Sequence, residues 1–107
     1  MKGKKIYVKT KIPDERYIDC RMLQLTHERG GLFYKFISAN APGVPDRILI
    51  TPSGAVWFIE LKSESGRLAK IQRWQIDRIK QRGANARVIR GLDEAEKFIE
   101  EVMPSGV

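Results

Sequence analysis

The sequence predicts an α/β domain in which helices flank a mixed β-sheet. Segments with helical spacing and short apolar blocks follow one another in the order α, β, β, β, α, β, α. The chain has 107 residues, 42% of them apolar, which suits one domain with one core. We expect this single domain at residues 12–103, between a flexible basic N-terminus at residues 1–11 and a flexible tail at residues 104–107.

The first helix is predicted from Asp14 to about Arg29. Along it, an acid and three apolar residues recur three and four positions apart and share one face: Glu15, Ile18, Met22 and Leu25. Gly30 and Gly31 end the helix. The aromatic and apolar block LFYKFI at 32–37 is too short for a helix and predicts a strand, and SANAPGV at 38–44 predicts a loop.

The next two apolar blocks predict a β-hairpin. Residues 47–51 and 55–61 flank the turn cluster PSG at 52–54. The second block contains WFIEL, which is nearly all apolar rather than alternating. This composition suits a strand that is covered on both faces.

A helix, a strand and a last helix complete the predicted domain. The helix runs from residue 66 or 67 to Arg82 and carries Leu68, Ile71, Gln72, Gln75 and Ile79 along one side. ARVIR at 86–90 is a short strand. DEAEKFIEEV at 93–102 is the last helix, in which Asp93 and Glu96 have the spacing of a capping box.

Basic residues dominate one part of the chain. The formal net charge is +7, and residues 62–90 contain nine basic residues and two acids. This excess indicates either a polyanionic partner, with nucleic acid favoured over membrane, or a solvated surface. One cysteine, the lack of a signal-peptide pattern and the lack of a long apolar run favour a soluble intracellular protein, in the cytoplasm of a bacterium or phage-infected host or in a eukaryotic nucleus.

The hairpin places two acids opposite each other. If its turn is centred on Ser53, Asp46 faces Glu60 across the strands with β-carbons about 4.5 to 5.5 Å apart, and Lys62 projects from the same face. Such carboxylates repel each other unless a cation lies between them. Oxygen ligands suit Mg²⁺ or Mn²⁺, with the backbone carbonyl of Leu61 as an extra ligand. The alternative is a plain surface ion-pair cluster at a strand end.

Zinc fits this chain less well than magnesium or manganese. The sequence has one histidine, His27, and one cysteine, Cys20, far from the spacing of a zinc site. We expect His27 to be a surface residue at a helix end. We expect Cys20 to be a small packed side chain.

The stretch GVPDRILITPSGAVWFIELKSESGRLAKIQ at 43–72 resembles the virus-type replication-repair nuclease (VRR-NUC) domain of the PD-(D/E)XK nuclease superfamily. Gly43, Pro45 and Asp46 match a G-x-PD element, and Glu60, Leu61 and Lys62 match ExK. Gln72 and GANARVI at 83–89 match the helix and strand that follow. Upstream, ERYIDCRMLQL and RGGLFYKF extend the resemblance to residues 14–96. Each motif is weak alone, but their order and spacing are specific.

The resemblance implies a restriction-endonuclease-like αβββαβ core and names site residues. It implies that Asp46 and Glu60 bind metal, that Lys62 is catalytic, and that Gln72 and Glu15 lie near the site, with Glu15 as a further candidate metal ligand. Two of these positions and Lys35 have other interpretations. Glu15 could simply be a first-turn acid, Gln72 a boundary residue of its helix, and Lys35, which falls at a family lysine, a guard of an edge strand.

The acid pair and the resemblance together imply a Mg²⁺- or Mn²⁺-dependent endonuclease that hydrolyses DNA phosphodiester bonds with water as the nucleophile. Nucleic-acid contacts are predicted for Arg67, Lys70, Arg73, Lys35 and the lysine-rich start. Trp74 could stack on a base or face a core or a partner. Small size and the relatives suggest a homodimer acting on branched or junction DNA, with a helicase or another replication-repair partner. The alternatives are a non-cleaving nucleic-acid-binding module and a nuclease acting on RNA.

Overall fold

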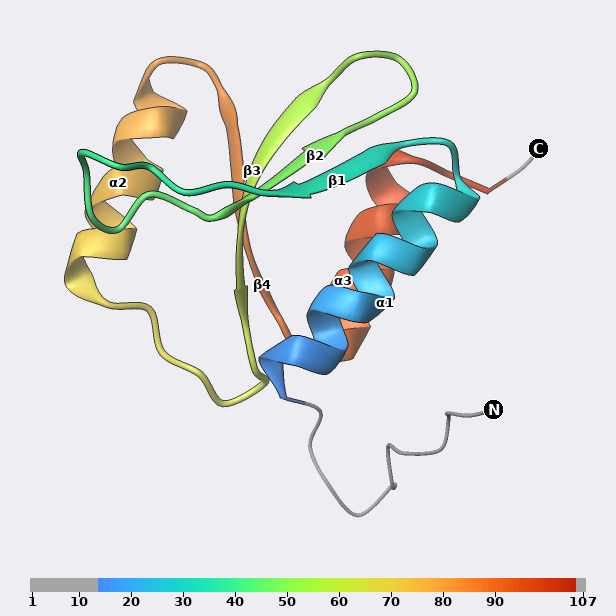
Figure 1. Cartoon of the computed structure of the whole chain (residues 1–107), viewed down its shortest axis with the longest axis horizontal. Coiled ribbons are helices and arrows are strands. Elements are labelled where there is room, and N and C mark those ends of the chain that lie inside the picture. The colour runs from blue at the N-terminus through green and yellow to red at the C-terminus, as the bar shows by residue number, and fades with distance from the viewer. Residues whose placement is uncertain (1–13, 106–107) are drawn as a thin grey trace.

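The computed structural model describes residues 14–105 and contains the seven expected elements in the expected order (Figure 1). They are α1 (Glu15–Glu28), β1 (Leu32–Lys35), β2 (Arg47–Ile50), β3 (Val56–Lys62), α2 (Lys70–Gln81), β4 (Asn85–Arg90) and α3 (Gly91–Val102). The predicted flexible N-terminus and the last two residues of the predicted tail lie outside the described residues. Within the tail, the Ser105 backbone N–H donates to Glu100 Oε2 at 3.3 Å.

The four strands form one mixed sheet in the order β1-β2-β3-β4. β1 pairs antiparallel with β2, and β2 pairs antiparallel with β3. β4 pairs parallel with β3, because α2 carries the chain back across the sheet between them. The predicted hairpin of β2 and β3 is therefore correct. β4 lies on the side of β3 that faces away from β2.

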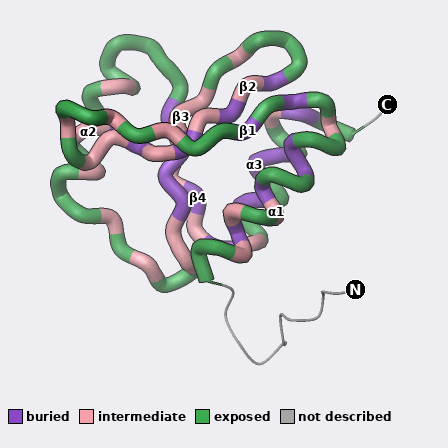
Figure 2. Tube along the Cα trace, viewed as in Figure 1, coloured by how far each residue is buried: buried purple, intermediate pink, exposed green. Residues whose placement is uncertain are grey.

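The main core lies between the sheet and the α1/α3 helix pair (Figures 1 and 2). Helix α1 begins at Asp14, whose Oδ1 accepts a hydrogen bond from the Tyr17 backbone N–H at 3.1 Å. The core side chains come from α1, from α3 and from every strand; the largest fully buried ones are Ile18, Met22, Leu49, Ile59, Leu61, Ile89 and Ile99. The predicted apolar face of α1 is confirmed, except that Glu15 at its start is exposed.

Helix α2 covers the opposite face of the sheet with one fully buried side chain, Ile76. Ile76 was not among the residues expected on the covered side, and the helix begins at Lys70, later than the predicted residue 66 or 67. Residues 66–69 instead form a connection, in which the Gly66 backbone N–H donates to the Ser63 carbonyl. Ile71, expected on the covered side, is 41% exposed.

Two smaller predictions are wrong. Helix α3 begins at Gly91, and Glu94 Oε1 accepts a hydrogen bond from the Arg90 backbone N–H at 2.8 Å, so Asp93 and Glu96 form no capping box. Cys20 is exposed rather than packed, because it lies outside the stripe of α1 that faces the core.

Within residues 14–105, the helices are too short or too polar to cross a membrane.

Candidate active site

The hairpin register agrees with the predicted pairing of the two acids. Arg47 pairs with Ile59 and Ile48 pairs with Phe58, so the register, continued by one residue, sets Asp46 opposite Glu60. Both acids lie at the end of the sheet where β2 begins and β3 ends. The charge of Asp46 acts directly on the Glu60 carboxyl group.

Glu60 is a buried carboxylate held by two side chains. It is 6% exposed, and its neighbours in β3 are mostly apolar. Lys62 Nζ lies 3.7 Å from Glu60 Oε2, and Gln72 Nε2 donates to the same oxygen at 3.2 Å. Lys62 is therefore on the same face of β3 as Glu60, as expected from the strand period.

The first turn of α2 fixes the orientation of Gln72. Its Oε1 accepts a hydrogen bond from the Ala69 backbone N–H at 2.9 Å. Because a backbone N–H can only donate, the amide oxygen must face Ala69, and the amide nitrogen must face Glu60. Gln72 thus joins the site, as its resemblance to the family glutamine implied, and is more than a boundary residue of its helix.

Asp46 is held by the residue that follows it. Arg47 Nη1 lies 2.9 Å from Asp46 Oδ1 and also donates to the Asp46 carbonyl at 3.2 Å. The Asp46 side chain is 51% exposed, so it lies at the mouth of the site, whereas Glu60 lies at its floor.

Each acid therefore has one oxygen held and one oxygen open. Among the described residues, no hydrogen bond or ion pair engages Asp46 Oδ2 or Glu60 Oε1. Carboxylates that are oriented by hydrogen bonds on one oxygen are typical of metal ligands. The two open oxygens are the atoms available to a shared ligand.

Lys62 and Arg47 do not fully offset the burial of Glu60 and its repulsion by Asp46. Burial, together with the nearby charge of Asp46, raises the pKa of Glu60 from 4.5 to about 7, although Lys62 opposes the shift. The charge of Glu15 also raises this pKa, which places the first turn of α1 near the site. A divalent cation would relieve this repulsion, and an all-oxygen donor set suits Mg²⁺ or Mn²⁺.

Of the two other predicted ligands, Glu15 is not grouped with the acid pair and the Leu61 carbonyl stays a prediction. Within residues 14–105, no cluster of three His, Cys, Asp or Glu side chains could hold a metal ion, so Glu15 does not complete a three-carboxylate site. Leu61 has its side chain in the core, on the opposite face from Glu60, as expected. Its carbonyl is an additional candidate ligand.

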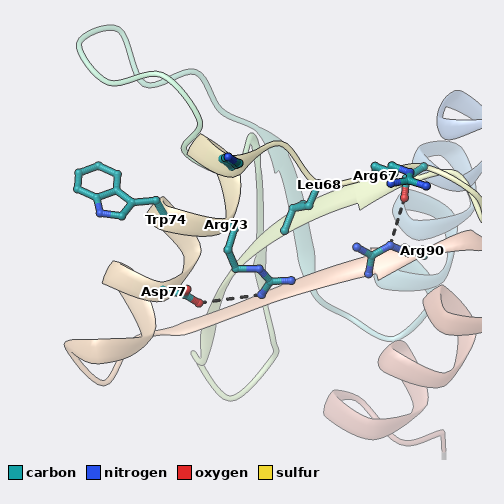
Figure 3. A pocket seen from close by; sticks show the side chains of 8 residues that line it. Arg67, Leu68, Arg73, Trp74, Asp77 and Arg90 are labelled. Carbon is teal, nitrogen blue, oxygen red and sulfur yellow. Dashed lines mark hydrogen bonds and ion pairs between the residues drawn. The ribbon is translucent and has the colours of Figure 1, made fainter.

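The predicted nucleic-acid-binding residues of the second half lie together. Arg67, Lys70 and Arg73 line a groove of about 660 Å³ beside α2, together with Trp74, Asp77 and Arg90. Arg73 lies between α2 and β4, and Trp74 projects outward from the helix (Figure 3). Trp74 is 52% exposed, which excludes a core role. Lys35 is not in this groove: it ends β1 opposite Arg47 and is exposed, as an edge guard would be.

The model of the VRR-NUC domain family matches residues 8–93. This chain belongs to the VRR-NUC family. A solved structure described as "VRR_NUC domain" has a TM-score of 0.75 and 30% sequence identity, covering 80% of this chain and 94% of that one. A second, described as "VRR_NUC domain protein", has a TM-score of 0.72 at 18% identity, covers 90% and 93% of the two chains, and shows likeness of fold alone.

A phage protein is also similar to this VRR-NUC domain. "Putative nuclease p44" of Acyrthosiphon pisum secondary endosymbiont phage 1 is 37% identical over 49 residues, which are 46% of this chain and 53% of that protein. The chain therefore spans about half the length of this relative. The family and its α/β fold are those that the sequence motifs implied.

Sequence reasoning about this VRR-NUC domain missed three charged residues near the site. Arg47 and Asp19 form an ion pair, with 2.7 Å between Arg47 Nε and Asp19 Oδ1. Arg90 pairs with Lys62 across the parallel strands β3 and β4 and lines the groove. The one available signal was the spacing of Asp19, four residues after Glu15 and thus on the same side of α1.

Proposed function

We propose that this VRR-NUC domain is a Mg²⁺- or Mn²⁺-dependent endonuclease that hydrolyses DNA phosphodiester bonds. The observation that carries the proposal is the acid pair Asp46 and Glu60, in which each carboxylate has one fixed oxygen and one open oxygen. The family match and the phage relative's name support the nuclease class.

The residues of the site divide the work. A divalent cation bound by Asp46 and Glu60 would stabilise the charge that develops on the phosphate and make water a better nucleophile. Lys62 has ammonium protons to offer to the attacking water or to a phosphate oxygen. Gln72 keeps Glu60 in place, because it connects that carboxylate to the first turn of α2.

The groove beside α2 supplies the nucleic-acid interface. Its cationic side chains Arg67, Lys70, Arg73 and Arg90 face one acid, Asp77. Asp77 lies 4.0 Å from Arg73 in an exposed pair of low energy, so Arg73 is available to a phosphate. Such contacts give affinity with little sequence preference, and the exposed ring of Trp74 offers a stacking surface for an unpaired base.

A homodimer would place two such sites on one branched or junction DNA. An apolar surface suited to a second copy lies on the same face of the sheet as α2, on the part that this helix does not cover. Two rows of cross-strand neighbours form it: Leu32, Ile50 and Val56, and Tyr34, Ile48 and Phe58. Leu32, Tyr34 and Val56 are 42–51% exposed. Light scattering checks this: the wild type should be dimeric and Tyr34→Lys monomeric, and a monomeric wild type would refute the interface.

Cleavage assays test the catalytic proposal. Asp46→Ala, Glu60→Ala and Lys62→Ala should each abolish cutting of plasmid and four-way junction DNA in Mg²⁺ or Mn²⁺ while binding persists, because they remove ligands or protons but leave the groove. Glu101→Gln, which breaks an exposed ion pair between α3 and Arg87 of β4, serves as the control and should cut normally. The same assays on RNA substrates show whether the enzyme cuts DNA or RNA. Undiminished cutting by any of the three variants would disprove the assigned roles.

A further inference from the structure

The first residue of β2, Arg47, is a buried guanidinium at the start of an otherwise apolar strand. Its side chain is 9% exposed. Removing such a charge from water costs several kcal/mol unless partners compensate for it. A strand of sequence RILI would gain core packing from an apolar residue at this position, so the arginine calls for another explanation.

Arg47 is compensated by acids on two different elements. Its Nε lies 2.7 Å from Asp19 Oδ1 in α1, and its Nη1 lies 2.9 Å from Asp46 Oδ1 at the strand end. Burial lowers the pKa of Arg47, but hydrogen bonds and charges of Asp19 and Asp46 outweigh burial and raise it. The guanidinium is therefore a permanently charged link between α1 and Asp46.

We infer that Arg47 and Asp19 are positioning residues that orient Asp46 so that its Oδ2 faces the shared ligand. The inference rests on the proposed function. Arg47 contacts both the carboxylate and the carbonyl of Asp46, which fixes the side chain relative to its own backbone. Without that link, a side chain that is half exposed would sample several rotamers and would lose entropy on binding a cation.

The geometry on Glu60 supports this assignment. Gln72 and Lys62 occupy Glu60 Oε2 in the way that Arg47 occupies Asp46 Oδ1. The two carboxylates are thus oriented by separate elements, Asp46 by α1 through Arg47 and Glu60 by α2 through Gln72. Hydrogen-bonded partners of ligating carboxylates commonly change metal affinity or activity by about 10- to 100-fold when mutated.

Two conservative variants test the inference. Arg47→Lys keeps the positive charge but lacks the planar fork that reaches two acids at once, and Asp19→Asn keeps the shape but removes the charge that anchors Arg47. Each should raise the Mn²⁺ concentration for half-maximal cleavage by about tenfold, while cleavage at saturating Mn²⁺ recovers most of the wild-type rate. Calorimetric Mn²⁺ binding without nucleic acid should weaken by the same factor.

Controls separate this inference from the proposed function and from loss of structure. Glu101→Gln breaks an ion pair with Arg87 whose length, 2.9 Å, equals that between Arg47 and Asp46. This pair lies on the surface of α3, so the substitution should leave both Mn²⁺ measurements unchanged. Circular dichroism and thermal unfolding confirm that the variants are folded. If Asp46→Ala binds Mn²⁺ as the wild type does, the metal site itself is misplaced and the proposed function fails.

Two outcomes would overturn the inference alone. If Asp46→Ala loses Mn²⁺ binding but folded Arg47→Lys and Asp19→Asn bind Mn²⁺ with wild-type affinity, the link has only a structural role. If Arg47→Lys binds Mn²⁺ more tightly, Arg47 acts as a competing cation rather than a positioning residue.

Discussion

At the scale of single residues, an ionised Glu60 destabilises the folded protein. It is a carboxylate in a largely apolar strand, close to a second acid, and its pKa is raised to about 7 by burial first and by Asp46 next. The unfolded chain releases this proton near pH 4.5. Between these two values the folded chain holds more protons than the unfolded chain, so protons stabilise the fold.

The metal-free protein should therefore lose stability as the pH rises from 5 to 7.5. The expected change in unfolding free energy is on the order of 2 kcal/mol, because each unit of pKa shift corresponds to about 1.4 kcal/mol. Urea unfolding in EDTA at the two pH values measures it. The acids whose pKa is lowered, Asp14, Glu100 and Glu101, act in the opposite direction and mainly at more acidic pH.

Glu60→Gln is the matched control for this pH dependence. It keeps the size of the side chain and removes the titration, so its stability should change much less between pH 5 and 7.5. Equal slopes for wild type and variant would show that Glu60 ionises in the folded protein at its ordinary pKa.

At the scale of elements, the loop before β2 and the start of α2 approach each other through a glycine. Gly43 has φ 84°, and a Cβ there would lie 2.7 to 2.9 Å from Ile71, including its backbone. Gly54 in the hairpin turn has φ 95° but no atom within 4 Å of such a Cβ. The G-x-PD glycine therefore sets the distance between Asp46 and the helix that carries Gln72.

Gly43→Ala should destabilise the protein more than Gly54→Ala does. Both substitutions place alanine at positive φ, which costs about 1 to 2 kcal/mol. Gly43→Ala must also displace α2, which adds about 1 to 3 kcal/mol. Urea unfolding of the two variants gives the difference, and equal losses would mean that the loop, rather than the helix, absorbs the contact.

The sequence predicted local structure better than contacts between distant elements. The hairpin register could be predicted because the turn at Pro52, Ser53 and Gly54 fixes which residues face each other, and with it the pairing of Asp46 and Glu60. The ion pair of Arg47 with Asp19 joins residues 28 positions apart. No local pattern reports such a contact, since it depends on how α1 lies across the sheet.

The start of α2 shows the same limit. Residues 66–69 continue a helical spacing, yet the helix begins only at Lys70, after a turn at Gly66. Arg90 was overlooked as a groove residue because its place beside Lys62 follows from the parallel pairing of β3 and β4. Residue spacing along the chain predicts which residues share a face of one helix or strand. It does not predict which faces of different elements come together to form the site.

At the scale of the whole molecule, charge is segregated in space as well as in sequence. The basic segment of residues 62–90 brings Arg67, Lys70, Arg73 and Arg90 to one groove. The acids of α3 instead pair with Arg21 of α1, with Arg29 directly after α1 and with Arg87 of β4. The groove cations are thus left largely uncompensated, and their field favours a polyanion.

This arrangement predicts that nucleic-acid binding weakens steeply with salt and that single groove residues account for part of the slope. Arg73→Gln should lower the slope of log affinity against log salt by about one unit, because one phosphate contact and its released counterion are lost. Arg82→Gln is the control: Arg82 is also exposed, at the opposite end of α2 and outside the groove lining. Fluorescence anisotropy with a labelled junction from 50 to 300 mM salt, roughly the range over which such contacts weaken, measures both slopes. A reduction as large in Arg82→Gln as in Arg73→Gln would mean that net charge, and not the groove, determines binding.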